Sequence, residues 1–168
     1  GARLTSNVLS VLGAAPMLGR NFTLDEDRTG NERVVILSYR MWRSLFASDP
    51  NVLDKTITLD RKPYIVVGVM GKDFVFPIKT QLDASELWVP MAFTEEERKS
   101  VGDNFDYNIV ARLKPGVSLA QARADVERVA QIIREGYPAA AKSQFEVHGV
   151  VLGLREDALG DYRRPIII

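Results

Sequence analysis

The chain has 168 residues, of which 46% are hydrophobic and 26% are charged, and its 22 basic residues are balanced by 22 acidic ones. This composition is that of a globular protein and excludes an extensively disordered chain. Zero net charge argues against a nucleic-acid-binding protein, which neutralises phosphates with surplus positive charge, and the absence of cysteine excludes disulfides and thiolate metal sites.

The first elements in chain order are a strand and short helical turns. The segment ARLTS has the pattern of a strand end. Ser6 or Asn7 then serves as N-cap of a short apolar helix, which Gly13 ends. Thr23 and Glu26 have the spacing of a capping box, so we expect a further helical turn there.

A buried strand and an amphipathic helix follow. The continuous apolar run VVIL at residues 34–37 predicts a strand buried on both faces. Ser38 is placed to cap the next helix. One face of that helix is expected to carry the apolar residues at helical spacing, Tyr39, Trp42, Leu45 and Phe46.

The middle of the chain predicts β-structure. TITL alternates apolar and polar residues, DRKP is a turn, and YIVVGVM is more apolar, so the two runs should form an antiparallel hairpin. The segment ELWVPM predicts a short strand that ends at Pro90. Thr94 and Glu97 form a second capping box.

The last third predicts a strand, a helix and a strand. IVARL leads through the turn KPG to a third capping box, Ser118 with Gln121. Apolar residues then recur every three or four positions until Gly136 and Pro138 end the helix. FEVHGVVLGL returns as a strand.

We therefore expect an α+β fold in which two βαβ units, one at each end of the chain, flank a strand-rich middle. The first and last strands should then lie close together, so that both termini leave from one side.

Residue types that carry chemistry are few and have structural explanations. His148, the one histidine, lies in a strand-like run without a nucleophile motif. The acidic residues Asp25, Glu26 and Asp27 suit a helix start, and Asp103 and Asp106 lack the rest of a calcium loop. Ser38, Ser44 and Ser100 lack a Gly-x-Ser-x-Gly context, and the glycines form no phosphate-binding loop. Trp42 and Trp88 are expected in the core, and Arg163 and Arg164 in solvent. The sequence thus predicts no catalytic residue, no cofactor site and no metal site.

Six segments in order resemble the MacB-like periplasmic core domain, the extracytoplasmic part of ABC-transporter permeases of the FtsX/MacB type. The resemblance runs from about residue 3 to the C-terminus and is carried by TSNVLSVLGAAPMLGRNFTLDED, VVILSYRMWRSLF, DPNVLDKTITLDRKPYIVVGVM, ELWVPM, NIVARLKPGVSLAQARADVERVAQII and LREDALGDYRRP. LKPGVSLAQA together with the late LGDYRRP is similar to the large duplicated permeases of environmental bacteria.

The resemblance implies one domain over residues 1–168 with two lobes. Residues 1–33 and 106–164 would form a porter-like lobe, residues 34–105 an inserted strand-rich lobe, and residues 165–168 the start of a transmembrane helix. Such a domain lies in the periplasm, between two membrane helices of a permease. It has no catalytic role and transmits motion driven by an ABC ATPase subunit to a periplasmic substrate, protein or lipoprotein. A second permease copy is a further partner that the resemblance implies.

Three local departures from the family accompany this interpretation. Family members often carry aromatic residues near Val8 and Leu9. Family members commonly have glycine at the position of Asp54 and, in the hairpin turn, at that of Arg61.

The rival function is that of a free-standing extracytoplasmic module that binds a peptide or lipoprotein. An enzyme built on a carboxylate cluster is a further alternative. The permease hypothesis requires an apolar stretch of about 20 residues near each end of the domain in the full reading frame, and the rival does not.

Overall fold

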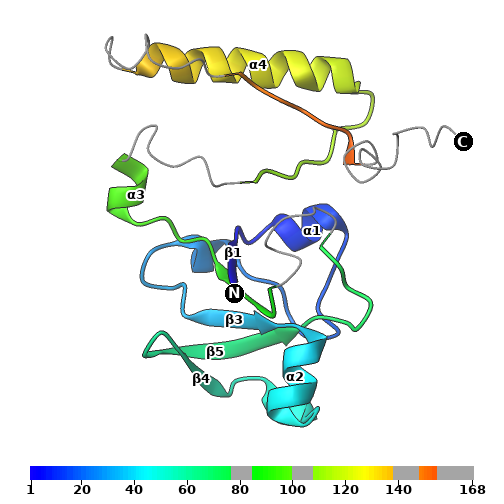
Figure 1. The fold of residues 1–168 in the computed structure, drawn as a ribbon, viewed down its shortest axis with the longest axis vertical. Helices are drawn as coiled ribbons and strands as arrows, with labels where there is room; N and C mark the ends of the chain where they lie inside the picture. Colours follow the sequence, from blue (N-terminus) through cyan, green and yellow to red (C-terminus); the bar gives the residue numbers. More distant parts are fainter. Residues whose placement is uncertain (77–84, 100–107, 138–147, 155–168) are drawn as a thin grey trace, which may run out of the picture. The chain divides into compact units, whose positions relative to one another are not determined.

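The computed structural model describes residues 1–76, 85–99, 108–137 and 148–154. The chain divides into two compact units, Gly1–Val110 and Ala111–Ile168. The first unit contains a sheet with short helices, and the second contains one long helix, labelled α4 in Figure 1. Among the described residues, no helix combines the length and the apolar character needed to cross a membrane.

The sheet of the first unit is mixed. Its six strands lie in the order β1-β6-β3-β5-β2, and β4 also pairs with β5. The β1–β6 and β3–β5 pairs are parallel, and the other pairs are antiparallel. The strands are β1 (Ala2–Leu4), β2 (Leu18–Gly19), β3 (Val34–Leu37), β4 (Thr56–Leu59), β5 (Lys62–Val69) and β6 (Leu87–Pro90). The hairpin expected from the sequence is confirmed as β4–β5, and the strand expected to end at Pro90 is confirmed as β6.

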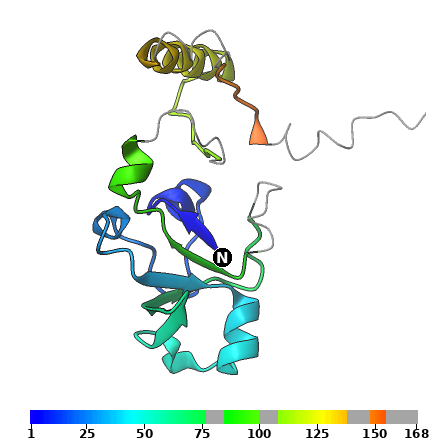
Figure 2. The ribbon, with the colours of Figure 1, turned by 60° about the vertical axis from the view of Figure 1, so that its left-hand side comes forward.

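Strand β3 separates two apolar clusters because alternate side chains of a strand point to opposite faces. Val34 and Ile36 belong to a cluster that also contains residues of α1 (Val8–Leu12). Val35 and Leu37 belong to a second cluster, which contains Trp42 of α2 (Tyr39–Phe46). Figure 2 shows α1 and α2 on opposite sides of the sheet. All four β3 residues are buried, which confirms the expectation drawn from the run VVIL.

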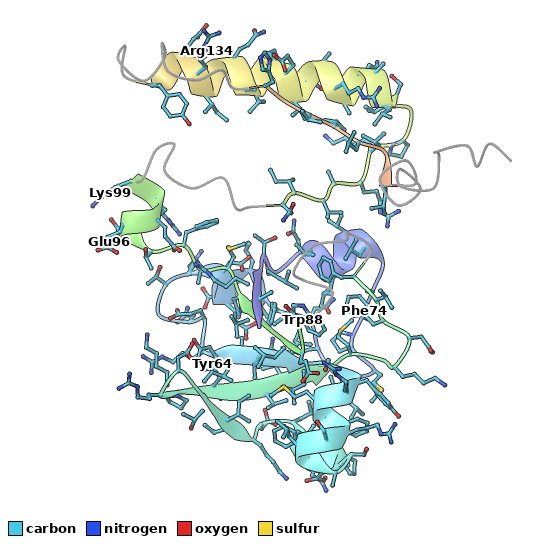
Figure 3. All side chains as sticks on the ribbon, viewed as in Figure 1. Tyr64, Phe74, Trp88, Glu96, Lys99 and Arg134 are labelled. Atoms are coloured by element: carbon cyan, nitrogen blue, oxygen red, sulfur yellow. The ribbon has the colours of Figure 1, made fainter. Side chains whose placement is uncertain are left out.

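Both tryptophans lie in this core, as expected. Trp42 is buried in the cluster with α2, and its indole Nε1 donates a hydrogen bond to the Asp49 carbonyl oxygen at 2.9 Å. Trp88 lies in the opposite cluster, where its ring meets that of Phe74 edge to face at 5.7 Å (Figure 3). The indole of Trp42 thereby fixes the chain just after α2, while Trp88 fills the core beneath α1.

The short helices of the first unit begin and end at capping residues. Asn7 is the N-cap of α1, and Gly13 ends that helix with a left-handed φ of 72°. The Ser38 hydroxyl accepts a hydrogen bond from the Met41 N–H at 3.0 Å at the start of α2. The remaining short helices of this unit are η1 (Leu24–Asp27), η2 (Pro50–Val52) and α3 (Glu95–Lys99). The capping boxes of η1 and α3 are formed as the sequence predicts.

One prediction for α2 is wrong. Leu45 was expected on the buried face, but its side chain is 67% exposed. Trp42 is buried, and Tyr39 and Phe46 pack partly against the same cluster. At 100° per residue, Leu45 lies at the edge of the arc centred on these residues, so an eight-residue helix crossing the sheet leaves it in solvent.

Asp54 and Arg61, the two positions at which the family resemblance leads us to expect glycine, adopt left-handed backbone conformations. Arg61 in the β4–β5 turn has a φ of 64°, next to Asp60 at 47°, as a two-residue hairpin turn of type I′ requires. Asp54, just before β4, has a φ of 61°. The local turn shapes therefore match those of a glycine-containing chain, and the non-glycine residues accept the strain.

Gly19 in β2 cannot carry a side chain. Its φ is 76°, and a Cβ atom there would lie 2.2 Å from the carbonyl oxygen of Val67. The register of β3 against β5 shifts between Val35 and Ile36, opposite the same part of β5. Glycine thus permits β2 to approach the strand where its pairing is irregular.

The second unit is organised around α4 (Leu119–Gly136). The Ser118 hydroxyl accepts from the Gln121 N–H at 3.2 Å, and the Gln121 side chain accepts from the Ser118 N–H at 2.8 Å, so the third capping box is confirmed. The expected strand at residues 109–113 is absent, and the described part of the other expected strand (145–154), residues 148–154, also contains no strand. A strand needs a backbone ladder with a neighbouring strand, and no such ladder is formed by the described residues of these two segments.

Strand β1 shares a sheet with β3, and Leu4 and Leu9 pack with Ile36 and Trp88. The parallel pairing of β1 with β6 places the first strand at the edge of this sheet. The expected division into a porter-like lobe (1–33 and 106–164) and a strand-rich lobe (34–105) stays a prediction. The expected transmembrane start at residues 165–168, with Arg163 and Arg164, lies outside the described residues.

Candidate functional site: the contact between strand β1 and helix α3

The residues with catalytic potential in the sequence occupy structural positions. His148 is 63% exposed, and its Nδ1 lies 3.4 Å from Glu127 Oε1. The Ser38 hydroxyl caps α2, and the Ser44 hydroxyl donates to the Met41 carbonyl oxygen at 3.3 Å. Asp103, Asp106 and Ser100 lie outside the described residues. These contacts agree with the structural interpretation of each residue, and the lack of a catalytic role stays a prediction.

The three acidic residues around η1 each have a partner that suits a helix start. Asp25 pairs with Arg28 at 3.2 Å, and Asp27 accepts from the Ser6 N–H at 2.8 Å. Glu26 is buried and bonds Arg20 at 2.7 Å. Burial favours the neutral acid, but the hydrogen bonds from Arg20 and the Thr23 N–H outweigh it and lower the pKa of Glu26. Among the described residues, no group of three potential ligands could hold a metal ion.

The first unit also carries a cleft of about 410 Å³ beside the start of α2, lined by residues of segments 38–40, 70–76 and 85–88. Apolar side chains, including those of Phe76 and Trp88, form part of it, and Arg40 and Glu86 form an ion pair there. Since the Ser38 hydroxyl is used as a helix cap, the described lining offers neither an activated nucleophile nor a pair of acids.

The strongest polar cluster of the first unit joins β1 to α3 through Arg3. Two guanidinium nitrogens of Arg3 donate to the two carboxylate oxygens of Glu97, at 2.5 and 3.1 Å. The Arg3 Nε donates to the Met91 carbonyl oxygen at 2.8 Å, and Nη2 contacts the same oxygen. The guanidinium also lies 5.7 Å from the centre of the Phe93 ring. Arg3 thus contacts Met91, Phe93 and Glu97, which all lie in the segment after β6. We call the paired side chains the Arg3–Glu97 link.

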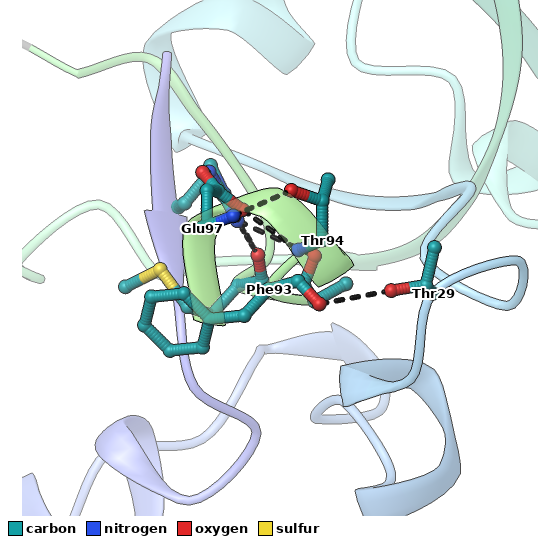
Figure 4. A network of polar contacts seen from close by, with 7 residues as sticks. Thr29, Phe93, Thr94 and Glu97 are labelled. Atoms are coloured by element: carbon teal, nitrogen blue, oxygen red, sulfur yellow. Dashed lines mark hydrogen bonds and ion pairs between the residues drawn. The ribbon is translucent and has the colours of Figure 1, made fainter. Parts of the chain in front are cut away.

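Glu97 is held in place by the start of its own helix (Figure 4). Its carboxylate accepts from the Thr94 N–H at 2.8 Å, and its N–H donates to the Thr94 hydroxyl at 3.2 Å. The Thr29 hydroxyl donates to the Phe93 carbonyl oxygen at 2.9 Å, which ties the loop after η1 to the same segment. The hydrogen bonds from Arg3 and from the Thr94 N–H lower the pKa of Glu97 to about 2. The carboxylate is therefore ionised at neutral pH.

This cluster is suited to joining segments rather than to chemistry. A bidentate arginine–carboxylate pair is directional, and each of its ionic hydrogen bonds is stronger than a neutral one. The Arg3 and Glu97 side chains are 38% and 30% exposed, so the solvent weakens the pair. The spacing of Thr94 and Glu97 predicts their capping box, but it does not predict Arg3 as the partner of Glu97, because Arg3 and Glu97 are 94 positions apart. No local pattern signals that pairing.

In the second unit, a comparable contact joins α4 to residues 148–154. The Gly149 N–H donates to Glu127 Oε2 at 2.8 Å, and the Arg123 Nε donates to the Val151 carbonyl oxygen at 3.0 Å. The Gly149 N–H, with His148, lowers the pKa of Glu127. A Cβ atom at Gly149 would lie 2.6 Å from the Val126 carbonyl carbon, so glycine permits this close approach.

Known proteins similar to this chain are transporter permeases. A model of the MacB-like periplasmic core domain matches residues 1–129. The macrolide export ATP-binding/permease protein MacB of Campylobacter fetus is 25% identical over 126 residues, which are 75% of this chain and 19% of that protein. MacB of Campylobacter jejuni is 25% identical over 112 residues, 66% of this chain and 17% of that protein. The chain thus spans about a fifth of the curated relatives it matches.

Two solved structures share the fold. The extracellular domain of the noncanonic ABC-type transporter YknZ from Gram-positive bacteria gives a TM-score of 0.56 at 21% identity, covering 89% of this chain and 68% of that one. The periplasmic region of MacB from Actinobacillus actinomycetemcomitans gives 0.51 at 18% identity, covering 77% and 54%. The α+β, two-lobed fold class expected from the sequence is thereby confirmed, as is the extracytoplasmic location in an inner-membrane permease. The chain belongs to the MacB-like periplasmic core domain family of ABC transporter permeases.

Proposed function

We propose that this periplasmic domain is not an enzyme and that it transmits ATP-driven motion of the permease's membrane helices to a periplasmic substrate or partner. Membership of the permease family supports the setting of this proposal. The driving ATPase, a second permease copy and a periplasmic protein or lipoprotein are the partners that such a mechanism involves. They belong to the whole protein, of which this chain is about a fifth in the curated relatives.

The observation that carries the proposal is the built contact between β1 and α3. A domain that transmits displacement needs close packing, which resists compression, and firm attachment where force enters. The two apolar clusters on β3 supply the packing. The Arg3–Glu97 link fixes β1, which we propose as one entry point. The other proposed entry point, around Tyr162–Pro165, together with a membrane helix from residue 165, lies outside the described residues.

Labelling the whole permease tests this function. The domain has no cysteine, so Arg128→Cys on α4 gives one labelling position within it. Arg128 is exposed and forms a surface pair with Asp125, which makes the change mild. The permease, otherwise free of reactive cysteines, is reconstituted with its ATPase in vesicles that contain acceptor lipids. Energy transfer then reports the height of the label above the bilayer.

The proposal expects the height to differ between the nucleotide-free and the ATP-trapped transporter. An ATPase that cannot hydrolyse or release nucleotide provides the control for cycling. An unchanged height in all nucleotide states, with active ATP turnover, would contradict motion transmission. The full reading frame distinguishes the permease from the free-standing binding module, because only the permease requires an apolar stretch near each end of the domain.

A further inference from the structure

Strand β1 has little backbone attachment of its own. It is three residues long, lies at the edge of the sheet and pairs with β6 alone among the described strands. The register runs from Ala2 opposite Trp88 to Leu4 opposite Pro90, and proline has no N–H to donate. Within the sheet, a displacement applied along β1 is resisted by this short ladder, by the hydrogen bond from the Met91 N–H to the Leu4 carbonyl oxygen at 2.9 Å, and by the buried side chain of Leu4.

The side chain of Arg3 extends this attachment beyond the end of β6. It binds the carbonyl oxygens of Met91 and Ala92 and both carboxylate oxygens of Glu97. All of these acceptors lie in the segment that continues through α3 toward the second unit. The capping box with Thr94 in turn prevents Glu97 from rotating away. The contacts thus connect the edge strand with the helix that precedes the change of unit.

We propose that the Arg3–Glu97 link adds a direct side-chain path, beside the sheet, by which displacement of strand β1 reaches helix α3. This inference rests on the proposed function and assigns Arg3 and Glu97 as positioning residues for it. The neighbouring pair Lys99–Glu95 makes a useful contrast. Its members lie in the same helix at 3.5 Å, are far more exposed and bridge no other element.

The test compares matched variants in the height assay described above, with the single label moved from α4 to Glu96→Cys on α3, a residue that is exposed. Arg3→Met and Glu97→Gln each remove the ionic link, whereas Lys99→Met removes an ion pair from the same helix without touching β1. We expect Arg3→Met and Glu97→Gln to reduce the ATP-dependent height change at least twofold, while ATP turnover stays within about twofold of the parent. Lys99→Met should leave both unchanged.

A covalent replacement keeps the test independent of stability. In a doubly substituted R3C/E97C permease that carries its label on a thiol-free, bioorthogonal side chain in place of Glu96, a short bismaleimide bridge between the two cysteines should restore the height change that the unbridged protein lacks. If the parent permease shows no height change, the proposed function fails. If the parent moves and Arg3→Met and Glu97→Gln move as far, or if the bridge restores nothing, only the link is refuted.

Discussion

The two units of this domain stabilise their main elements in different ways. In the first unit, β3 is buried on both faces by clusters drawn from residues 4–88. In the second unit, α4 buries Ala130, while Val126, Val129, Ile132 and Ile133 are each 40–55% exposed. The first unit therefore depends on long-range packing. The described part of the second depends more on local caps and on the few contacts of residues 148–154 with α4.

Truncating one apolar residue in each unit should give the largest difference. Leu37→Ala removes a fully buried side chain and should cost about 2–5 kcal/mol of unfolding free energy. Ile133→Ala removes a half-exposed one from α4 and should cost less than about 1 kcal/mol, because less apolar area leaves water. Urea unfolding of the 168-residue domain, followed by circular dichroism at 222 nm, measures both. Equal losses would show that α4 is packed as tightly as β3.

Removing the N-cap of α4 should destabilise the second unit without changing the stability of the first. Ser118→Ala deletes the side-chain acceptor of the first turn, which is typically worth about 1 kcal/mol. Both tryptophans belong to the first unit, so their fluorescence follows that unit, whereas amide exchange along α4 follows the second. We expect faster exchange in α4 and an unchanged fluorescence transition, with Ser118→Thr close to the parent. A matching shift of the fluorescence transition would mean that the units unfold together.

The smallest expected effect is a change in the stability of the first unit when Arg61 in the β4–β5 turn is replaced. Arg61→Gly relieves a left-handed residue in the β4–β5 turn, which costs about 1–2 kcal/mol, but loosens the unfolded chain by about 0.5–1 kcal/mol. The net gain in stability should be about 0.5–1 kcal/mol, read from thermal unfolding by tryptophan fluorescence. Lys62→Gly, one residue on and within β5, is the control and should destabilise. A loss with Arg61→Gly would contradict the turn geometry.

Local features of the fold could be predicted from the sequence because their physical causes lie within a few residues. The three capping boxes, the left-handed stop at Gly13 and the β4–β5 hairpin each depend on neighbours within one turn. The doubly buried strand β3 was readable because a continuous apolar run has no polar face to expose.

Features that depend on distant partners could not be predicted in the same way. The sequence predicts strands at residues 109–113 and 145–154, but it does not say which backbone would pair with them. The pairing of β1 with β6 is also hidden, since a three-residue edge strand carries no register signal. The Arg3–Glu97 link was missed for the same reason. An arginine in a strand has many possible partners, and one sequence does not choose among them.

The pairing of β1 with β6 also has a consequence for biogenesis. Strand β1 leaves the ribosome and crosses the membrane before β6, yet its described partner is made only when Leu87–Pro90 have followed. Until then the hairpin β4–β5 and strand β3 can pair, but the sheet lacks β6 next to β3, and β1 has no strand to pair with. The strand nearest the N-terminus is therefore the last of the sheet to dock, so secretion through the translocon must keep it unpaired while the intervening residues arrive.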